Sequence, residues 1–185
     1  IYKCVLSTGC ASTDNWTVAT VTAETTFTSM TQDTINGVLY AGSNINGVIF
    51  KCVLSTGCAS TGNWVTATDT PSNNASSMAV DVTNGAIYAG DAGGNIHKCV
   101  LSTGCASTGN WVTATSIAAN TFGSMAVDSL NGVIYVADSS SAGNIYKCIL
   151  STGCISTGNW TRAFSGIDLG IMSMVEDSVN GAIYV

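Results

Sequence analysis

One eight-residue segment occurs four times in this chain, and this repetition constrains the fold more than any other feature of the sequence. KCVLSTGC stands at 3–10, 51–58 and 98–105, and KCILSTGC stands at 147–154. The tryptophans, at positions 16, 64, 111 and 160, repeat with steps of 48, 47 and 49 residues. A period in this range indicates an architecture in which each repeat is one supersecondary unit. We therefore expect a single repeat domain over 1–185, whose units are listed by their approximate bounds: 1–48, 49–95, 96–144 and 145–185.

Each repeat contains four segments with the character of β-strands. In one unit these are SSMAVD (76–81), GAIYAGD (85–91), NIHKCVL (95–101) and NWVTATS (110–116). An Asn-Gly turn signal joins the first two, and the Thr, Val, Ile and Tyr content suits strands, whereas no window keeps a helical apolar period. Four strands in a repeat of this length are typical of β-propeller blades. The sequence therefore predicts an all-β propeller of four four-stranded blades.

The chain begins and ends in the middle of a blade. It opens on IYKC (1–4), the third strand of a unit, and closes on GAIYV (181–185), the second strand. We expect the two half-blades to form one shared blade, which closes the ring and covers its strand edges. The same half-blades can instead pair between molecules, as a two-chain ring or a filament. Because the chain starts inside a repeat without an initiator Met, we expect a processed product or a piece of a longer protein.

The eight cysteines form four pairs with identical spacing: Cys4 with Cys10, Cys52 with Cys58, Cys99 with Cys105, and Cys148 with Cys154. Zinc sites favour C-x2-C spacing or His partners, and this chain has a single His, so a metal site is not expected. We favour one disulfide within each repeat over pairing between neighbouring repeats. Such bonds indicate an oxidising compartment, outside the cell or at its surface. Closing so short a loop stabilises a fold by about 2–3 kcal/mol.

Composition argues against several classes of function. The net charge is −6, and four of the five basic residues are the repeated lysines at positions 3, 51, 98 and 147, so no basic patch for nucleic acid is present. The apolar runs are short and interrupted, so no membrane insertion is expected. His97, the only histidine, takes the place of Tyr2, Phe50 and Tyr146 in the other repeats. We assign His97 a structural role, which leaves no base for a nucleophile, and we expect no enzyme activity and no cofactor.

Three sets of repeated polar or aromatic residues are candidates for binding. One carboxylate closes the first strand of every unit, either as a Ca²⁺-binding ring or, as we favour, as a turn cap with a surface contact to the repeated lysine: Asp33, Asp81, Asp128 and Asp177. The tryptophans are candidate platforms for stacking sugars, although packing between blades is favoured: Trp16, Trp64, Trp111 and Trp160. Three sequons are candidate N-glycosylation sites: Asn15, Asn74 and Asn159.

The repeat resembles the blades of tachylectin-type five-bladed lectins. The matching motifs are Tyr2-Lys3, Asn15-Trp16, Ala19-Thr20 and the segment NGVLY at 36–40. The segment from Asp128 to Tyr146 is also similar to NHL-type repeats. The resemblance spans the whole chain, but the lectins have five repeats where this chain has four, and the cysteine pairs depart from the lectin pattern. It implies carbohydrate binding, because these lectins bind amino sugars between their blades.

The sequence thus predicts a non-enzymatic extracellular propeller that acts as a binding or adhesion module for a carbohydrate or cell-surface ligand. The alternative is a structural subunit of an extracellular fibre or surface assembly, self-associating through its terminal half-blades. Binding specificity is expected in the loops where the repeats differ, at 22–27, 69–76, 116–123 and 165–172.

Overall fold

The fold is all-β, as predicted, and it consists of antiparallel sheets that follow one another along the chain. A computed structural model describes residues 1–19, 26–69, 74–117, 121–140, 143–166 and 170–185. It contains three four-stranded sheets, β3–β6, β7–β10 and β11–β14, which we call blades 1, 2 and 3. A two-stranded sheet lies at each end of the chain, β1–β2 in the N-terminal half-blade and β15–β16 in the C-terminal half-blade.

The strand bounds follow the four-fold repeat. The N-terminal half-blade contains β1 (Tyr2–Cys4) and β2 (Trp16–Val18). Blade 1 contains β3 (Phe27–Asp33), β4 (Val38–Ser43), β5 (Val48–Val53) and β6 (Trp64–Asp69). Blade 2 contains β7 (Ala75–Asp81), β8 (Ala86–Asp91), β9 (Asn95–Val100) and β10 (Trp111–Ser116). Blade 3 contains β11 (Phe122–Asp128), β12 (Val133–Asp138), β13 (Ile145–Ile149) and β14 (Trp160–Phe164). The C-terminal half-blade contains β15 (Val175–Asp177) and β16 (Ala182–Tyr184).

The turn between the first two strands of each blade is set by a repeated Asp and Asn-Gly. In blade 2 the Asp81 carboxylate accepts hydrogen bonds from the Asn84 backbone N–H (3.0 Å) and from Asn84 Nδ2 (2.7 Å). Gly85 follows with a φ of +62°, in the left-handed region that favours glycine. The same carboxylate contacts recur in the other three repeats. The repeated Asp therefore caps the turn, as expected. Within the described residues it forms no ion pair with the repeated Lys, and Lys3, Lys51 and Lys98 have another partner described below.

The cysteine-bearing segment between the third and fourth strands folds into two short 3-10 turns per repeat. Their bounds are Leu6–Thr8 and Thr13–Asn15, Leu54–Thr56 and Thr61–Asn63, Leu101–Thr103 and Thr108–Asn110, and Leu150–Thr152 and Thr157–Asn159. The second cysteine of each pair lies between the two turns.

The four expected disulfides within the repeats are confirmed. The bonds join Cys4 to Cys10, Cys52 to Cys58, Cys99 to Cys105, and Cys148 to Cys154. Their Cα–Cα distances are 5.8–5.9 Å, within the ordinary range for a disulfide. Each bond ties the end of the third strand to the segment that leads into the fourth, so it fixes the outer part of a blade.

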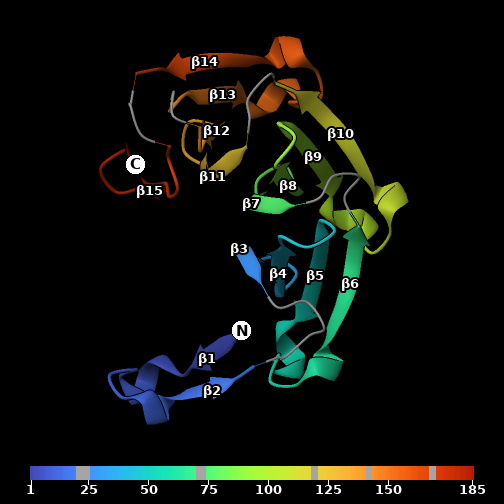
Figure 1. Ribbon diagram of the computed structural model, residues 1–185, viewed down its shortest axis with the longest axis vertical. Coiled ribbons are helices and arrows are strands. Elements are labelled where there is room, and N and C mark those ends of the chain that lie inside the picture. Colours follow the sequence, from blue (N-terminus) through green and yellow to red (C-terminus); the bar gives the residue numbers. More distant parts are fainter. Residues whose placement is uncertain (20–25, 70–73, 118–120, 141–142, 167–169) are drawn as a thin grey trace.

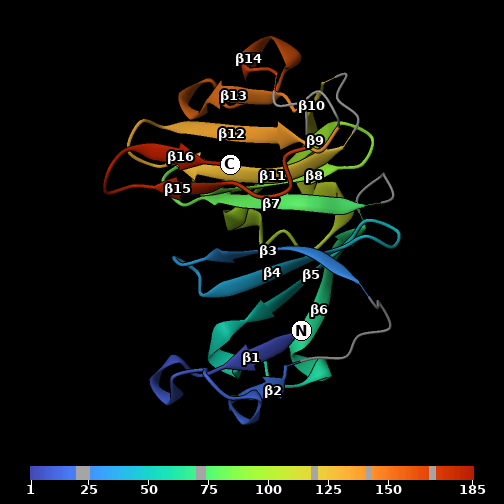
Figure 2. The same cartoon turned by 60° about the vertical axis from the view of Figure 1, so that its left-hand side comes forward.

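The blades are arranged around an open arc (Figure 1). The innermost strands β3, β7 and β11 lie toward the inside of the arc, and the outermost strands β6, β10 and β14 lie on its outer rim. A turned view shows the inner strands stacked one above another, with β15 and β16 beside β11 (Figure 2). The apolar core therefore lies between successive blades rather than at one centre.

The predicted fourth blade is present as two halves that remain separate sheets. In the part of the chain that the structure describes, β1 pairs with β2 and β15 pairs with β16, and no ladder joins β1 to β16. Figure 1 places the N-terminal half-blade at one end of the arc and the C-terminal half-blade at the other. The arc therefore has two end faces.

Candidate binding surfaces

Each internal junction between blades is formed by the same three side chains from each side. The later blade contributes the Leu of Leu-Ser-Thr-Gly, the second Cys and the Trp, which together we call the knob. The earlier blade contributes a Tyr from its second strand, an Ile from its third and an Ala from its fourth, which together we call the socket. Blades 1 and 2 join through the knob Leu101, Cys105 and Trp111 and the socket Tyr40, Ile49 and Ala67. Blades 2 and 3 join through the knob Leu150, Cys154 and Trp160 and the socket Tyr88, Ile96 and Ala114.

These internal knobs and sockets are fully packed. All twelve side chains are at most 8% exposed. Burial raises the pKa of Tyr40 to about 12, with the Asp33 charge adding to the effect. Burial likewise raises the pKa of Tyr88, with Asp81 nearby. The rings are therefore held in their neutral form, as expected for a phenol taken out of water.

The two end faces of the arc carry the same residues without the same burial. The knob of the N-terminal half-blade is exposed, with Leu6 at 87% and Trp16 at 48%. The socket of blade 3 is open, and its Tyr135, Ile145 and Ala163 line a hollow of about 300 Å³. One end of the chain thus presents a knob with no socket, and the other presents a socket with no knob.

The knob of blade 1 faces the N-terminal half-blade. Its members are Leu54, Cys58 and Trp64. Cys58 is 4% exposed, so the disulfide that it forms with Cys52 is buried here, as the equivalent bonds are at the internal junctions. Of the half-blade residues that line the space between the two, Ile1 and Ala19 stand in the Ile and Ala positions of a socket.

A second hollow, of about 370 Å³, lies at this incomplete socket. Among the described residues that line it, none stands in the position of Tyr40 and Tyr88 in the internal sockets. Its lining includes Met30 and Trp64. Met30 is 45% exposed, whereas the equivalent Met78 is 6% exposed. The N-terminal half-blade therefore leaves an apolar surface of blade 1 only partly covered.

The repeated lysines add a polar contact at every junction. Lys3 Nζ donates to the carbonyl of Gly57 (3.2 Å), Lys51 Nζ to that of Gly104 (2.7 Å), and Lys98 Nζ to that of Gly153 (2.8 Å), always across to the next cysteine-bearing turn. Lys98 also lies 5.4 Å from the centre of the Tyr88 ring, and burial lowers its pKa. Lys147 is exposed and makes no such bond within the described residues. Sequence reasoning missed this role, although the strict repetition of Lys and Gly in all four units was its signal.

Hydroxyl groups hold the inner strands together. Thr28 Oγ1 donates to the carbonyl of Ala75 (2.9 Å) and Ser76 Oγ donates to that of Phe122 (2.6 Å), each across one junction. A hollow of about 210 Å³ lies between these strands, and its polar lining comes from Thr28 and serine side chains. All five methionines of the protein also line it: Met30, Met78, Met125, Met172 and Met174. These contacts explain the repeated Ser-Met pairs as packing of the inner strands.

Most of the tryptophans pack between blades, and two of the three sequon asparagines cap turns. Trp64, Trp111 and Trp160 are 6–8% exposed in the junctions, so among the four only Trp16 offers a ring face to solvent. The Asn15 and Asn159 side chains accept hydrogen bonds from the backbone N–H of Ser12 and Ser156 at the starts of the second 3-10 turns. Asn74 is partly buried just before β7. Glycosylation of the three sequons stays a prediction.

His97 is buried in blade 2 with one carboxylate partner. Its side chain is 2% exposed, and Nε2 lies 2.8 Å from Asp91 Oδ2. Asp91 also accepts from the backbone N–H groups of Gly93 and Asn95, so it organises the β8–β9 turn. The pair therefore has the contacts of a structural element, as the sequence suggested for His97.

No metal-binding group emerges in the described ranges. They contain no cluster of three or more His, Cys, Asp and Glu side chains that could hold an ion. Nor do they contain a helix long and apolar enough to cross a bilayer. Part of each loop expected to carry specificity, namely 22–25, 70–73, 118–120 and 167–169, lies outside the described residues.

Comparison with known proteins identifies the fold. No protein-family model matches the sequence, and no curated protein matches it either. A chain in the crystal structure of a nidogen/laminin complex is similar, with a TM-score of 0.72 and 12% identity. The match covers 90% of this chain and 59% of that one. The protein is therefore a β-propeller by fold, and it spans less than two thirds of the length of the matched chain. The more specific tachylectin or NHL type stays a prediction.

Proposed function

We propose that this chain is a non-enzymatic, extracellular protein-binding module, and that the two end faces of its arc are the binding surfaces. The observation that carries the proposal is the contrast in burial between equivalent residues. Leu150 and Trp160 are 4% and 7% exposed, whereas Leu6 and Trp16 are 87% and 48% exposed. Exposed apolar side chains whose equivalents are buried at both internal junctions favour a surface that is covered by a partner.

Two further observations support the proposal. The four disulfides fit an oxidising environment outside the cell. The structural neighbour with the propeller fold comes from a complex between two proteins, nidogen and laminin. Propellers use many surfaces for binding, so this likeness supports the class of function and no particular partner.

Hydroxyl-radical footprinting tests the proposal without knowledge of the partner. The oxidation of Trp16 is compared between the dilute purified chain and the same protein in the extracellular material of its source. Partner binding is expected to protect Trp16, while the buried Trp111 reacts slowly in both samples and serves as the internal control. Equal reactivity of Trp16 in the two samples would contradict a protein-covered end face.

Carbohydrate binding is a second candidate, favoured by one observation. Trp16 exposes its ring beside the hollow at the N-terminal half-blade, and exposed aromatic faces stack well on sugars. Amino sugars added to the purified chain at millimolar concentration are expected to protect Trp16 from oxidation if this candidate is right. Protection by extracellular protein without any effect of the sugars would favour the protein-binding function instead.

A further inference from the structure

One asparagine in the turn before each fourth strand uses only the oxygen of its side-chain amide. In blade 3 the Asn159 Oδ1 accepts hydrogen bonds from the Ser156 backbone N–H (3.1 Å) and from Ser156 Oγ (2.8 Å). Within the described residues Asn159 Nδ2 has no hydrogen-bond partner, and it is not buried, so it contacts solvent. The oxygen therefore holds the turn, and the nitrogen is left accessible.

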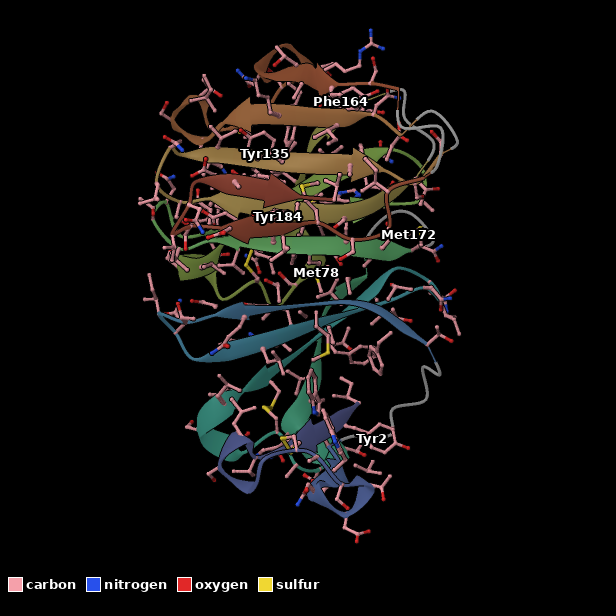
Figure 3. The ribbon with its side chains drawn as sticks, turned by 90° about the vertical axis from the view of Figure 1, so that its left-hand side faces the viewer. Tyr2, Met78, Tyr135, Phe164, Met172 and Tyr184 are labelled. Carbon is pink, nitrogen blue, oxygen red and sulfur yellow. A yellow bond between two sulfur atoms is a disulfide. The ribbon has the colours of Figure 1, made fainter. Side chains whose placement is uncertain are left out.

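The residue two positions after this asparagine is also at the surface. Thr161, on β14, is exposed, and its hydroxyl has no partner within the described residues. Trp160 is 7% exposed in the junction with blade 2, and because side chains alternate along a strand, Thr161 points away from that junction. Figure 3 shows Phe164, the last residue of β14, well away from Met78 on the inner strand β7. The sequon of Asn159 therefore lies on the outer rim, with its two polar members accessible.

The same position is exposed in blades that have a further blade after them. Val65 and Val112 stand at the position of Thr161 in blades 1 and 2. They are 51% and 52% exposed, although another blade follows each of them. Asn63 and Asn110, in the equivalent turns, are half-buried and likewise accept hydrogen bonds through Oδ1. The surface beside this turn is thus open at internal places in the arc as well.

We propose that Asn159 Nδ2 carries an N-linked glycan in the exported protein. The donor is an oligosaccharide attached to a polyprenyl diphosphate, which the exporting cell supplies together with its transferase. The amide nitrogen forms a bond to the anomeric carbon, the bond from this carbon to the diphosphate oxygen breaks, and the amide loses one proton. Oδ1 keeps its hydrogen bonds to Ser156, because the carbonyl end of the amide is unchanged. The proposal concerns the outer rim and does not rest on the end faces.

An exposed isoleucine beside this site gives the glycan an apolar surface to cover. Between positions 154 and 161, blade 3 differs from blades 1 and 2 at two positions only, which are 155 and 161. Ile155 directly precedes Ser156 and is 61% exposed, whereas the other repeats have Ala in its place. A glycan is bulky and solubilising, so it suits an exposed apolar side chain. The blade with the additional apolar side chain is thus the blade in which Thr161 completes the sequon.

The other two sequons have hydroxyl groups that are already engaged. In the sequon at 74–76, Ser76 Oγ donates to the carbonyl of Phe122 (2.6 Å), across a junction of inner strands. In the sequon at 15–17, Thr17 Oγ1 donates to a carbonyl of β1 (3.3 Å). Within the described residues, only the sequon in blade 3 keeps its hydroxyl without a partner. The structure therefore favours Asn159 over the other two asparagines.

Mass spectrometry of the native protein tests the proposal directly. The chain is purified from the extracellular material of its source, and its reduced tryptic peptide 148–162 is analysed with and without amidase release of N-glycans in heavy-oxygen water. Release converts a glycosylated Asn to a heavy-labelled Asp, so a label at Asn159 and none at Asn74 are expected. A digest in which Asn159 is unlabelled would overturn the inference, whether or not Asn74 is labelled.

Two substitutions move the sequon between blades, and each introduces the residue that the other blade carries. Thr161→Val removes the sequon and leaves the amide of Asn159 in its turn, whereas Val112→Thr creates a sequon in blade 2. Both variants and the wild type are secreted from a eukaryotic cell line. Thr161→Val is expected to lose its glycan, and Val112→Thr is expected to gain a second one, at Asn110. Val112→Ala, which adds no hydroxyl at the same exposed position, is the matched control and is expected to gain none.

The outcomes of this exchange separate the site from the reason given for it. Mapping the four disulfides in non-reduced digests shows whether each variant has folded. A glycan that persists on the peptide of Asn159 in Thr161→Val, or a secreted wild type without one, would overturn the inference. A wild type modified at Asn159 beside an unmodified Val112→Thr would overturn the argument that the geometry of this turn makes the site.

Discussion

Leu150→Ala is expected to destabilise the protein strongly, whereas Leu6→Ala, in a nearly identical segment, is expected to have little effect. Leu150 is 4% exposed and packs in a cluster with Tyr88 and Trp160. Transfer of a buried Leu out of water accounts for about 1.5–3 kcal/mol, and the cavity left behind raises the cost of Leu→Ala to about 2–5 kcal/mol. Because two large rings line this site and leave little room for collapse, we expect a loss of about 3 kcal/mol.

Leu6 provides the matched control, since the residues around it repeat those around Leu150. It is 87% exposed, so only a small part of its surface is removed from water in the single chain. We expect Leu6→Ala to cost about 0.3 kcal/mol, in proportion to that burial. The assay is urea unfolding with the disulfides intact, followed by Trp fluorescence, at a dilution where light scattering gives the mass of one chain. Equal losses for the two variants would refute the argument that the junction, rather than the local turn, holds the leucine.

Two further predictions concern the junctions. A Cβ at Gly90 would lie 2.7 Å from Ser77 Oγ and 2.8 Å from Met125 Cε, so Gly90→Ala is expected to lower the free energy of unfolding in urea by about 1–3 kcal/mol. Gly62→Ala is the control, because a Cβ there would have nothing within 4 Å, and it is expected to leave the free energy of unfolding unchanged. Equal effects of the two substitutions would contradict the close packing at Gly90. The pKa of Tyr40 is raised to about 12, so its contribution to stability is complete below the ordinary tyrosine pKa of about 10 and is lost as the pH rises through 12. Absorbance at 295 nm is therefore expected to show late-ionising tyrosines that titrate together with unfolding, and Tyr40→Phe is expected to reduce this late component by one tyrosine and leave that of the buried Tyr88. A late component that is unchanged in the variant would argue against the burial of Tyr40.

The periodic residues carried most of the fold prediction. The spacing of the Trp residues predicted the length of the repeat, and the strand-like segments within one unit predicted its four strands. The strands found in blade 2 differ by about one residue from those expected. The C-x5-C spacing predicted the disulfides, such as the bond from Cys52 to Cys58, because a partner so near in the sequence is simpler than one in another repeat. The roles of Asp81 and His97 also followed from their positions within the repeat.

The contacts between blades could not be derived in this way. A repeat states which residues recur, but the partner of Lys98 lies 55 residues away, at Gly153 in the next unit. Nor does the sequence distinguish Leu6 from Leu150, since both stand in nearly identical segments and differ only in what covers them. The joining of the terminal half-blades depends on the curvature of the arc, which is the sum of small rotations at every junction and is not encoded in any single motif.

The disulfides are confined to single blades, and this has a consequence for how such a protein can change its length. All eight cysteines are used in pairs six positions apart, so no disulfide joins one blade to the next. A recombination event that adds or deletes one unit therefore brings or removes a complete bond and leaves no odd thiol. The same unit carries its own knob, socket and lysine, so the new neighbours fit each other as the old ones did. The number of repeats in such a chain can therefore change by whole blades without any compensating substitution.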